Sequence, residues 1–176
     1  MPSSIEKVVD GFPFLTINPI IGTQDYESIT DIHLKLNSNA ASVQSNLGCG
    51  TLGLLFLTVF TADYATLPTT EFVLPVNPGP EPIIPTGSTG AAISDLQYHH
   101  TEYTKIFTEY KNTDKALCQL LLEFTDELYV GSLCHNYIGY GKTTTLALLD
   151  HLYSTYANIS ASALQDNNKS LRAPRQ

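Results

Sequence analysis

Apolar residues recur at three- and four-residue steps in four stretches of the chain, with polar residues at the positions between them. This spacing places the apolar side chains on one face of a helix, because an α-helix completes a turn about every 3.6 residues. It predicts helices over residues 24–44, 90–111, 114–134 and 143–157. The expected fold class is therefore mainly α, a bundle of helices joined by short loops.

Residues that start and stop helices stand at these boundaries. Thr89 precedes the second predicted helix, and Thr143 or Thr144 precedes the fourth, where a hydroxyl can accept a hydrogen bond from a free backbone amide. Asn112 and Thr113 are expected to interrupt the helical structure between the second and third helices. The apolar faces predict a core that includes Ile29, Ile32, Leu36, Leu117, Leu121, Leu149 and Leu152.

Two apolar segments of the N-terminal half do not follow the helical spacing. Residues 12–17 are expected to form a short strand, and residues 52–60 a buried strand or core segment. A short β-hairpin near the N-terminus is therefore an open alternative within the mainly helical fold. Residues 62–65 follow as a single predicted helical turn.

Prolines cluster in the middle of the chain, namely Pro68, Pro75, Pro78, Pro80, Pro82 and Pro85. Proline lacks the amide hydrogen and fixes φ, so neither a helix nor a central strand persists there. We expect an extended crossover on the surface. The chain is thus divided into an N-terminal segment with one long helix (1–67), the Pro-rich crossover (68–88), a helical bundle (89–171) and a basic tail (172–176), which together form one integrated domain.

The distribution of charge disfavours nucleic acid as a main partner. The formal net charge is −8, and residues 1–90 carry eight acids against two lysines. An acidic surface repels the phosphate backbone. Lys169, Arg172 and Arg175 form the one basic end and are the candidate nucleic-acid contacts. We expect RNA to bind weakly and without sequence preference, or through segments absent from this chain.

The three cysteines, Cys49, Cys118 and Cys134, are odd in number and widely spaced. This pattern fits neither a disulfide framework nor a zinc motif, and it favours a reducing, cytoplasmic location. Residues 1–11 lack the apolar region of a secretory signal. The most apolar run, residues 52–60, is far too short to span a membrane. We therefore expect no membrane association.

Residues 139–144, Gly-Tyr-Gly-Lys-Thr-Thr, resemble the end of a phosphate-binding loop. That loop requires a glycine where this chain has Asn136, and it follows a strand, whereas residues 128–133 are predicted to be helical. We therefore favour a glycine turn followed by a threonine cap, and we expect no nucleotide binding at Lys142.

Histidines and cysteines do not form a recognisable catalytic set. His99 and His100 are neighbours and point in different directions, whereas helical metal pairs need four-residue spacing. His100 is expected to pack on an apolar face, and His151 to be exposed. Cys134 and His135 are also neighbours, and Cys134 is expected to be a core residue at a helix end. We expect no catalytic residues, no metal, no cofactor and no small-molecule substrate.

Several short segments stand in a defined order between residues 15 and 172. They are Tyr26-Glu27-Ser28-Ile29, Ile32-His33, residues 39–50, residues 52–55, Tyr64, Phe72, Pro75, Pro78-Gly79, residues 85–87, residues 115–117, Tyr129, Gly139-Tyr140, residues 148–153, Tyr156 and residues 164–171. In this order the set resembles the capsid-forming region of copia-type retrotransposon Gag polyproteins of one divergent lineage. The family pattern favours a glycine where this chain has Cys49.

The resemblance implies a structural protein and not an enzyme. Gag proteins pack copies of themselves into a shell around the RNA of the element, and their capsid region is a helical bundle without catalytic residues. The resemblance therefore implies a cytoplasmic homo-oligomer. The zinc knuckle or basic segment with which such proteins often bind RNA is not evident in this sequence.

A second class of function stays open on the sequence alone. A domesticated Gag-derived protein-interaction module would use the proline-rich residues 75–85 to dock to a partner. An enzymatic function would rest on residues 139–144 alone. The size of the protein in solution distinguishes the first two classes, because particles or oligomers favour the capsid and a persistent monomer favours the interaction module.

Overall fold

The structure, a computed structural model, describes residues 4–17, 19, 26–44, 51–67 and 73–157. No strand forms among these residues, and the prediction of a mainly helical fold is confirmed. In chain order the elements are α1 (Ile5–Asp10), α2 (Tyr26–Ser42), the 3-10 turn η1 (Leu55–Leu57), α3 (Thr61–Tyr64), α4 (Gly90–Phe124), α5 (Glu127–Val130), the 3-10 turn η2 (Gly131–Leu133), α6 (Thr145–Leu152) and the π-helical turn η3 (Tyr153–Ala157).

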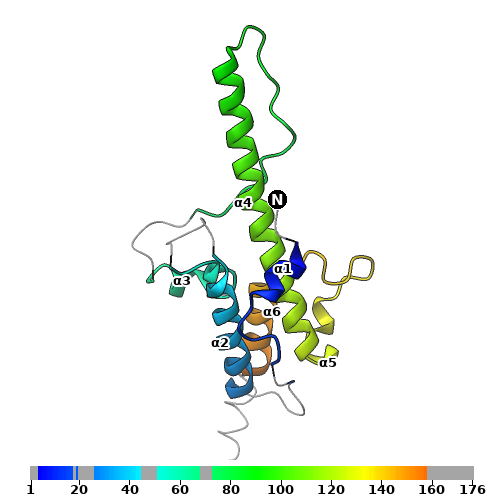
Figure 1. The fold of residues 1–176 in the computed structure, drawn as a ribbon. Coiled ribbons are helices and arrows are strands. Elements are labelled where there is room, and N and C mark those ends of the chain that lie inside the picture. Colours follow the sequence, from blue (N-terminus) through cyan, green and yellow to red (C-terminus); the bar gives the residue numbers. More distant parts are fainter. Residues whose placement is uncertain (1–3, 18, 20–25, 45–50, 68–72, 158–176) are drawn as a thin grey trace, which may run out of the picture.

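Helix α4 is the axis of the molecule (Figure 1). Its C-terminal half carries buried side chains and packs against α1, α2 and α6, whereas its N-terminal half extends away from them. A helix of 35 residues is about 52 Å long at 1.5 Å per residue. The helices packed on it are much shorter, with 17 residues in α2 and 8 in α6, so one half of α4 is left outside the body.

The predicted interruption at Asn112 and Thr113 is wrong, because α4 runs through both residues without a break. Asn, Thr and Asp interrupt helices when their side chains form hydrogen bonds with the nearby backbone. Here the carboxylate of Asp114 bonds to α6 instead, and Thr113 lies fully inside the core. The tertiary hydrogen bonds of Asp114 therefore keep its carboxylate from competing for the backbone of α4.

The helix predicted over residues 114–134 ends earlier than expected. Helix α4 stops at Phe124, Thr125 is extended, and α5 begins after Asp126, whose carboxylate accepts a hydrogen bond from the Leu128 amide at 2.9 Å. Aspartate is among the strongest helix-capping residues, so this start overrides the apolar spacing that continues into α5. Leu128, expected on the apolar face, is 78% exposed.

Helices α2 and α6 form where the apolar spacing predicts them. The Thr144 hydroxyl caps α6 by accepting from the Ala147 amide (3.2 Å), and Thr89 caps α4 through the Ala92 amide (3.3 Å). All the residues predicted for the core are buried, which confirms Ile29, Ile32, Leu36, Leu117, Leu121, Leu149 and Leu152.

The N-terminal segment folds without the strand predicted over residues 12–17. Helix α1, which the spacing did not predict, packs against α4. Beyond it, the Asn39 side chain of α2 accepts from the Phe14 amide (2.9 Å) and donates to the Phe14 carbonyl (2.8 Å). Asn39 therefore supplies the donor and the acceptor that a neighbouring strand would supply. The backbone of Phe14 is hydrogen-bonded in this way without a hairpin among the described residues.

Residues 51–60 form turns and η1 in place of the predicted strand, although they do belong to the core. Gly53 has a φ of 51° and lies against the end of α2, where an added Cβ would fall 2.5 Å from the Val43 carbonyl oxygen. The Leu54 amide donates to the Ala40 carbonyl at 3.0 Å. The last carbonyls of a helix need hydrogen-bond donors, and this segment provides one at the C-terminal end of α2. That contact, and not strand pairing, holds the segment in place.

The described part of the crossover, residues 73–88, is extended and lies beside the projecting half of α4 (Figure 1). The His100 ring joins the two, with its Nε2 3.1 Å from the Gly79 carbonyl oxygen. At the end of the crossover Gly87 has a φ of 89°, a conformation that favours glycine, and the chain then enters α4 at the Thr89 cap.

A buried carboxylate fastens α4 to α6. Asp114 is only 6% exposed, and its Oδ1 accepts hydrogen bonds from the Thr145 amide (3.0 Å) and the Thr145 hydroxyl (2.9 Å). The start of a helix carries a partial positive charge, so a carboxylate is favoured there. These bonds fix the start of α6 on the C-terminal half of α4.

Replacing Thr145 with valine tests this link. Thr145→Val keeps the shape but removes the hydroxyl donor from a buried carboxylate, and we expect it to lower the free energy of unfolding by about 1–3 kcal/mol. Urea denaturation measures the loss. Thr101→Val is the matched control, because Thr101 is exposed on α4, and its effect should stay within about 0.5 kcal/mol. Equal losses in the two variants would show that the Asp114–Thr145 link contributes nothing specific.

Candidate functional site

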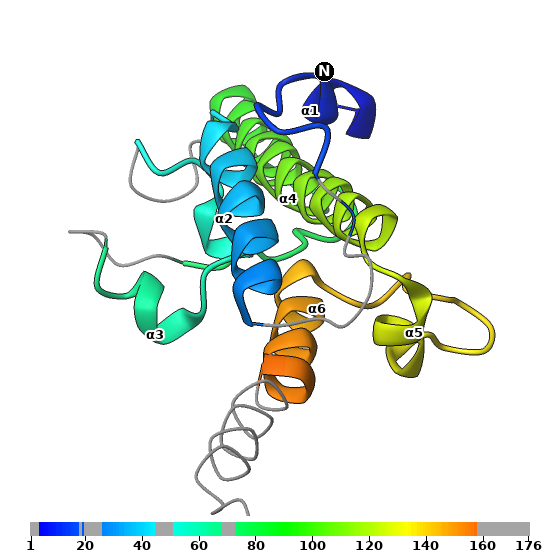
Figure 2. The same cartoon turned by 90° about the horizontal axis from the view of Figure 1, so that it is seen from below.

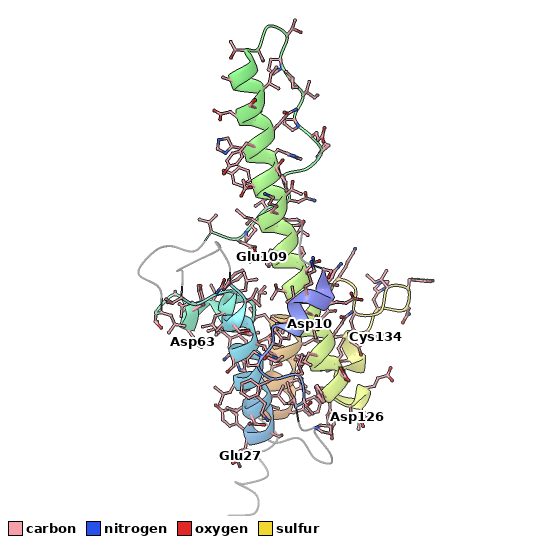
Figure 3. All side chains as sticks on the ribbon, in the orientation of Figure 1. Asp10, Glu27, Asp63, Glu109, Asp126 and Cys134 are labelled. Atoms are coloured by element: carbon pink, nitrogen blue, oxygen red, sulfur yellow. The ribbon has the colours of Figure 1, made fainter. Side chains whose placement is uncertain are left out.

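The projecting half of α4 and the crossover beside it form an arm, residues 79–105, that stands clear of the helical body (Figures 1 and 3). Large apolar side chains are exposed on it, with exposed fractions of 93% for Ile83, 62% for Tyr98 and 58% for Tyr103. Ile84 and Leu96 are exposed as well. The apolar spacing of α4 predicts a covered face, yet the described part of the single chain leaves this face open.

The arm carries little charge. Its charged residues are Glu81, Asp95, Glu102 and Lys105, and the last two form an ion pair at 2.7 Å. A surface of this kind has no basic stripe that would attract a phosphate backbone. Its exposed apolar and aromatic side chains are instead typical of a protein–protein contact.

Residues 139–144 form the turn that leads into α6, with Lys142 exposed. Two amides at the start of α6 already have acceptors, because the Thr145 amide bonds to Asp114 and the Ala147 amide to Thr144. A phosphate bound at a helix start depends on such amides. The Asp114 carboxylate occupies that place and would repel a phosphate. The geometry thus favours the glycine turn and threonine cap over a phosphate loop.

Neither of the two cysteines that the structure describes, Cys118 and Cys134, pairs with a histidine as nucleophile and base. Cys134 is exposed, contrary to the expected core position, because the helical region ends at η2 just before it. Figure 3 places Cys134 on the loop side of the body, and the neighbouring His135 accepts a hydrogen bond from the Tyr137 amide within that loop (3.2 Å). Cys118 is buried, and burial together with Asp114 raises its pKa to about 11, so its thiol stays protonated.

Three other histidines have structural contacts. His151, expected to be exposed, is partly buried because its Nε2 lies 3.1 Å from the Tyr129 carbonyl oxygen and 3.2 Å from the Ser132 hydroxyl. It therefore links α6 to α5 and η2. His100 packs between α4 and the crossover, and its neighbour His99 stacks on Tyr103 with ring centroids 6.4 Å apart.

Lys169, Arg172 and Arg175, the candidate nucleic-acid contacts, lie outside the described residues. Among the described residues, no three His, Cys, Asp or Glu side chains are grouped closely enough to hold a metal ion. None of the helices in that part of the chain is both long and apolar enough to cross a membrane.

An apolar hollow of about 410 Å³ lies where η1 and α3 meet α4. Phe56 stacks on Tyr110 in its wall, with ring centroids 5.9 Å apart. Asp114 also lines it, and burial, with a smaller contribution from that carboxylate, raises the pKa of Tyr110. The phenol therefore remains protonated, and the hollow is suited to an apolar group.

A second hollow, of about 690 Å³, opens along α2 and is lined by both polar and aromatic side chains. We call it the His33 groove. Helix α2 lies between α3 and α6 (Figure 2), and residues of all three regions line the groove. Its lining is Tyr26, Thr30, His33, Leu34, Asn37, Val59, Phe60, Asp63, Asp150, Tyr153 and Ser154.

His33 ties the segments around this groove together. Its Nε2 lies 2.7 Å from the Thr58 carbonyl oxygen and must carry the proton that this bond requires. Its Nδ1 lies 3.0 Å from the Tyr153 hydroxyl, which is also 3.4 Å from the Thr30 hydroxyl. In the neutral ring Nδ1 accepts from Tyr153. Burial lowers the pKa of His33, so this neutral form is favoured.

The sequence patterns did not single out His33 or Asp114. A signal for His33 was present, because Tyr26, Thr30, His33 and Asn37 recur at helical spacing and form a second stripe beside the apolar one. No comparable signal marks Asp114, since its partner Thr145 is distant in sequence. Only the tertiary fold brings those two residues together.

Comparisons of the chain with protein-family models, with curated proteins and with solved structures found no match.

Nucleotide binding at Lys142 is expected to be absent, because two helix-start amides already have acceptors and a carboxylate lies beside them. Titration with ATP or GTP and magnesium, followed by calorimetry, should give no saturable signal. Lys142→Ala should leave the titration unchanged. A saturable signal that this substitution abolishes would contradict the interpretation.

A lower pH is expected to reduce the free energy of unfolding, because His33 is protonated more readily in the unfolded chain. Its folded-state pKa lies below the unfolded value of about 6.5, so in that interval the unfolded chain binds more protons than the folded chain. Stability is therefore expected to fall as the pH drops through about 6.5, with Tyr26, Tyr153, Asp63 and Asp150 facing the same groove.

Urea midpoints between pH 8 and pH 5 measure this effect. His33→Gln, which keeps an amide donor for the Thr58 carbonyl, should show a shallower pH dependence, and His99→Gln on the exposed arm should behave as the parent does. Parallel curves for the parent and His33→Gln would rule out the His33 contribution.

Proposed function

We propose that this chain is a structural, Gag-like capsid domain that associates with copies of itself and catalyses no reaction. The single observation that carries the proposal is the arm, whose apolar side chains have no cover in the described single chain. The ordered resemblance to copia-type Gag supports it, as does the mainly helical fold.

Self-association through the arm follows from its composition. Ile83, Tyr98 and Tyr103 expose apolar surface that contact with another protein would remove from water. Aromatic side chains are enriched in such contacts, and the arm has few charges that would need to be desolvated. Two arms meeting by a two-fold rotation would present the same patch to each other, which is the commonest arrangement in homo-oligomers.

The helical body would then serve as the rigid base of the arm. Asp114 and Thr145 hold α6 on α4 close to the point where α4 leaves the body. A contact made at the tip of a stiff, continuous helix fixes the position of the body behind it. This property suits a protein that builds a regular shell.

RNA is expected to play a minor part in this chain. The proposed cytoplasmic assembly would rest on protein contacts, with RNA held weakly by Lys169, Arg172 and Arg175 or by segments outside this chain. The alternative proposal, a Gag-derived protein-interaction module, would use the same exposed crossover to bind a different protein.

Sedimentation or light scattering over a range of protein concentrations tests the proposal. The parent should shift to dimers or larger assemblies as concentration rises. Ile83→Glu combined with Tyr98→Glu should weaken association by about tenfold or more, because it places charges in the contact.

Leu128→Glu combined with Tyr137→Glu is the matched control. It makes the same change in charge at side chains that are 78% and 91% exposed on the body, and it should associate as the parent does. A parent that stays monomeric at every concentration would contradict self-association and favour the interaction module. Equal loss in both double variants would exclude the arm as the contact.

A further inference from the structure

The His33 groove is acidic on its open side. Asp63 enters it from α3 and Asp150 from α6, and both residues are exposed. The ion pairs found among the described residues are Lys35 with Asp31 and Lys105 with Glu102, so neither groove carboxylate is neutralised within that part of the chain. None of the groove's lining residues is a lysine or arginine, which leaves the carboxylates with no opposing charge in the lining.

Aromatic rings line the same groove. Phe60 and Tyr153 meet edge to face with centroids 6.0 Å apart, and Tyr26 meets Tyr153 in the same manner at 5.9 Å. His33 contacts Phe60 at 5.9 Å. The faces of such rings carry partial negative charge and attract cations, and a planar guanidinium also stacks on them.

An unpaired acceptor lies beside these groups. The amide oxygen of Asn37 is buried and has no hydrogen-bond partner among the described residues. Burying an acceptor without a donor costs free energy, which a ligand N–H would recover after rotation of the amide. The Thr58 carbonyl and the Nδ1 of His33, by contrast, already have partners inside the fold.

We propose that the His33 groove binds the side chain of an arginine presented by a partner polypeptide. The guanidinium would lie against the rings of Tyr26, Phe60 and Tyr153 and donate hydrogen bonds to Asp63 and Asp150. Its planar fork of five N–H donors matches several acceptors at once, whereas a lysine offers a compact charge with stronger hydration. The site is separate from the arm and does not depend on the function proposed above.

Titration with short peptides tests the proposal on the intact chain. The probe is acetyl-Gly-Arg-Gly-amide, added to the ¹⁵N-labelled protein at low salt and pH 8 while backbone and aromatic chemical shifts are recorded. Saturable shifts are expected around His33, Phe60 and Tyr153. The citrulline peptide keeps the shape but lacks the charge, and it should bind about tenfold more weakly or worse; the lysine peptide should fall between the two.

Removing the carboxylates provides the second test. Asp63→Asn combined with Asp150→Asn should lower the affinity for the arginine peptide by about tenfold or more, because charge-assisted bonds are lost. Asp10→Asn combined with Glu123→Gln is the matched control, since it changes net charge equally at exposed sites outside the groove. That control should keep the parental affinity.

Three results would contradict the proposed arginine site. Absence of saturable shifts with the arginine peptide would exclude it, and equal binding of the citrulline peptide would exclude recognition of charge. Equal loss in the groove variant and the control would mean that net charge alone attracts the peptide. The citrulline comparison uses the unmodified protein, so it stands even if a variant fails to fold.

Discussion

The hydrogen bonds between Asp114 and Thr145 are the constraint on which the rest of the structure depends. They place a buried carboxylate at the start of α6 and fasten that helix to the C-terminal half of α4. They also draw the side chain of Asp114 away from the backbone of α4, which then continues through a stretch of helix-breaking residues. The same carboxylate fills the position where a phosphate-binding helix start would hold its ligand.

The continuity of α4 separates the molecule into a packed body and an exposed arm. One half of the helix lies among α1, α2 and α6, and the other half extends beyond them with the crossover at its side (Figure 1). The two halves have similar apolar spacing in sequence but different surroundings. Apolar residues of the body are buried and stabilise the fold, while those of the arm are exposed, and the proposed self-association would cover them.

The sequence predicted the parts of the fold that depend on local periodicity. Ile32, Leu121 and Leu149 are buried because they lie on the apolar faces of their helices, and those faces could be recognised without a structure. The conformation of the other segments depends on long-range contacts. Asn39 replaces a strand beside Phe14, and the end of α2 determines the fold of the segment around Gly53. The His33 groove required three distant segments to meet, so its residues could not be grouped from spacing alone.

The most direct test is the conformation of α4 where the sequence suggests a break. Backbone ¹³Cα chemical shifts report helical structure residue by residue, and they can be measured on the dilute, unmodified chain. Helical shifts should continue without interruption from residue 108 to residue 118, including Asn112 and Thr113. Loss of helical shifts at these two residues would mean two separate helices, and the stiff arm would then have no structural basis.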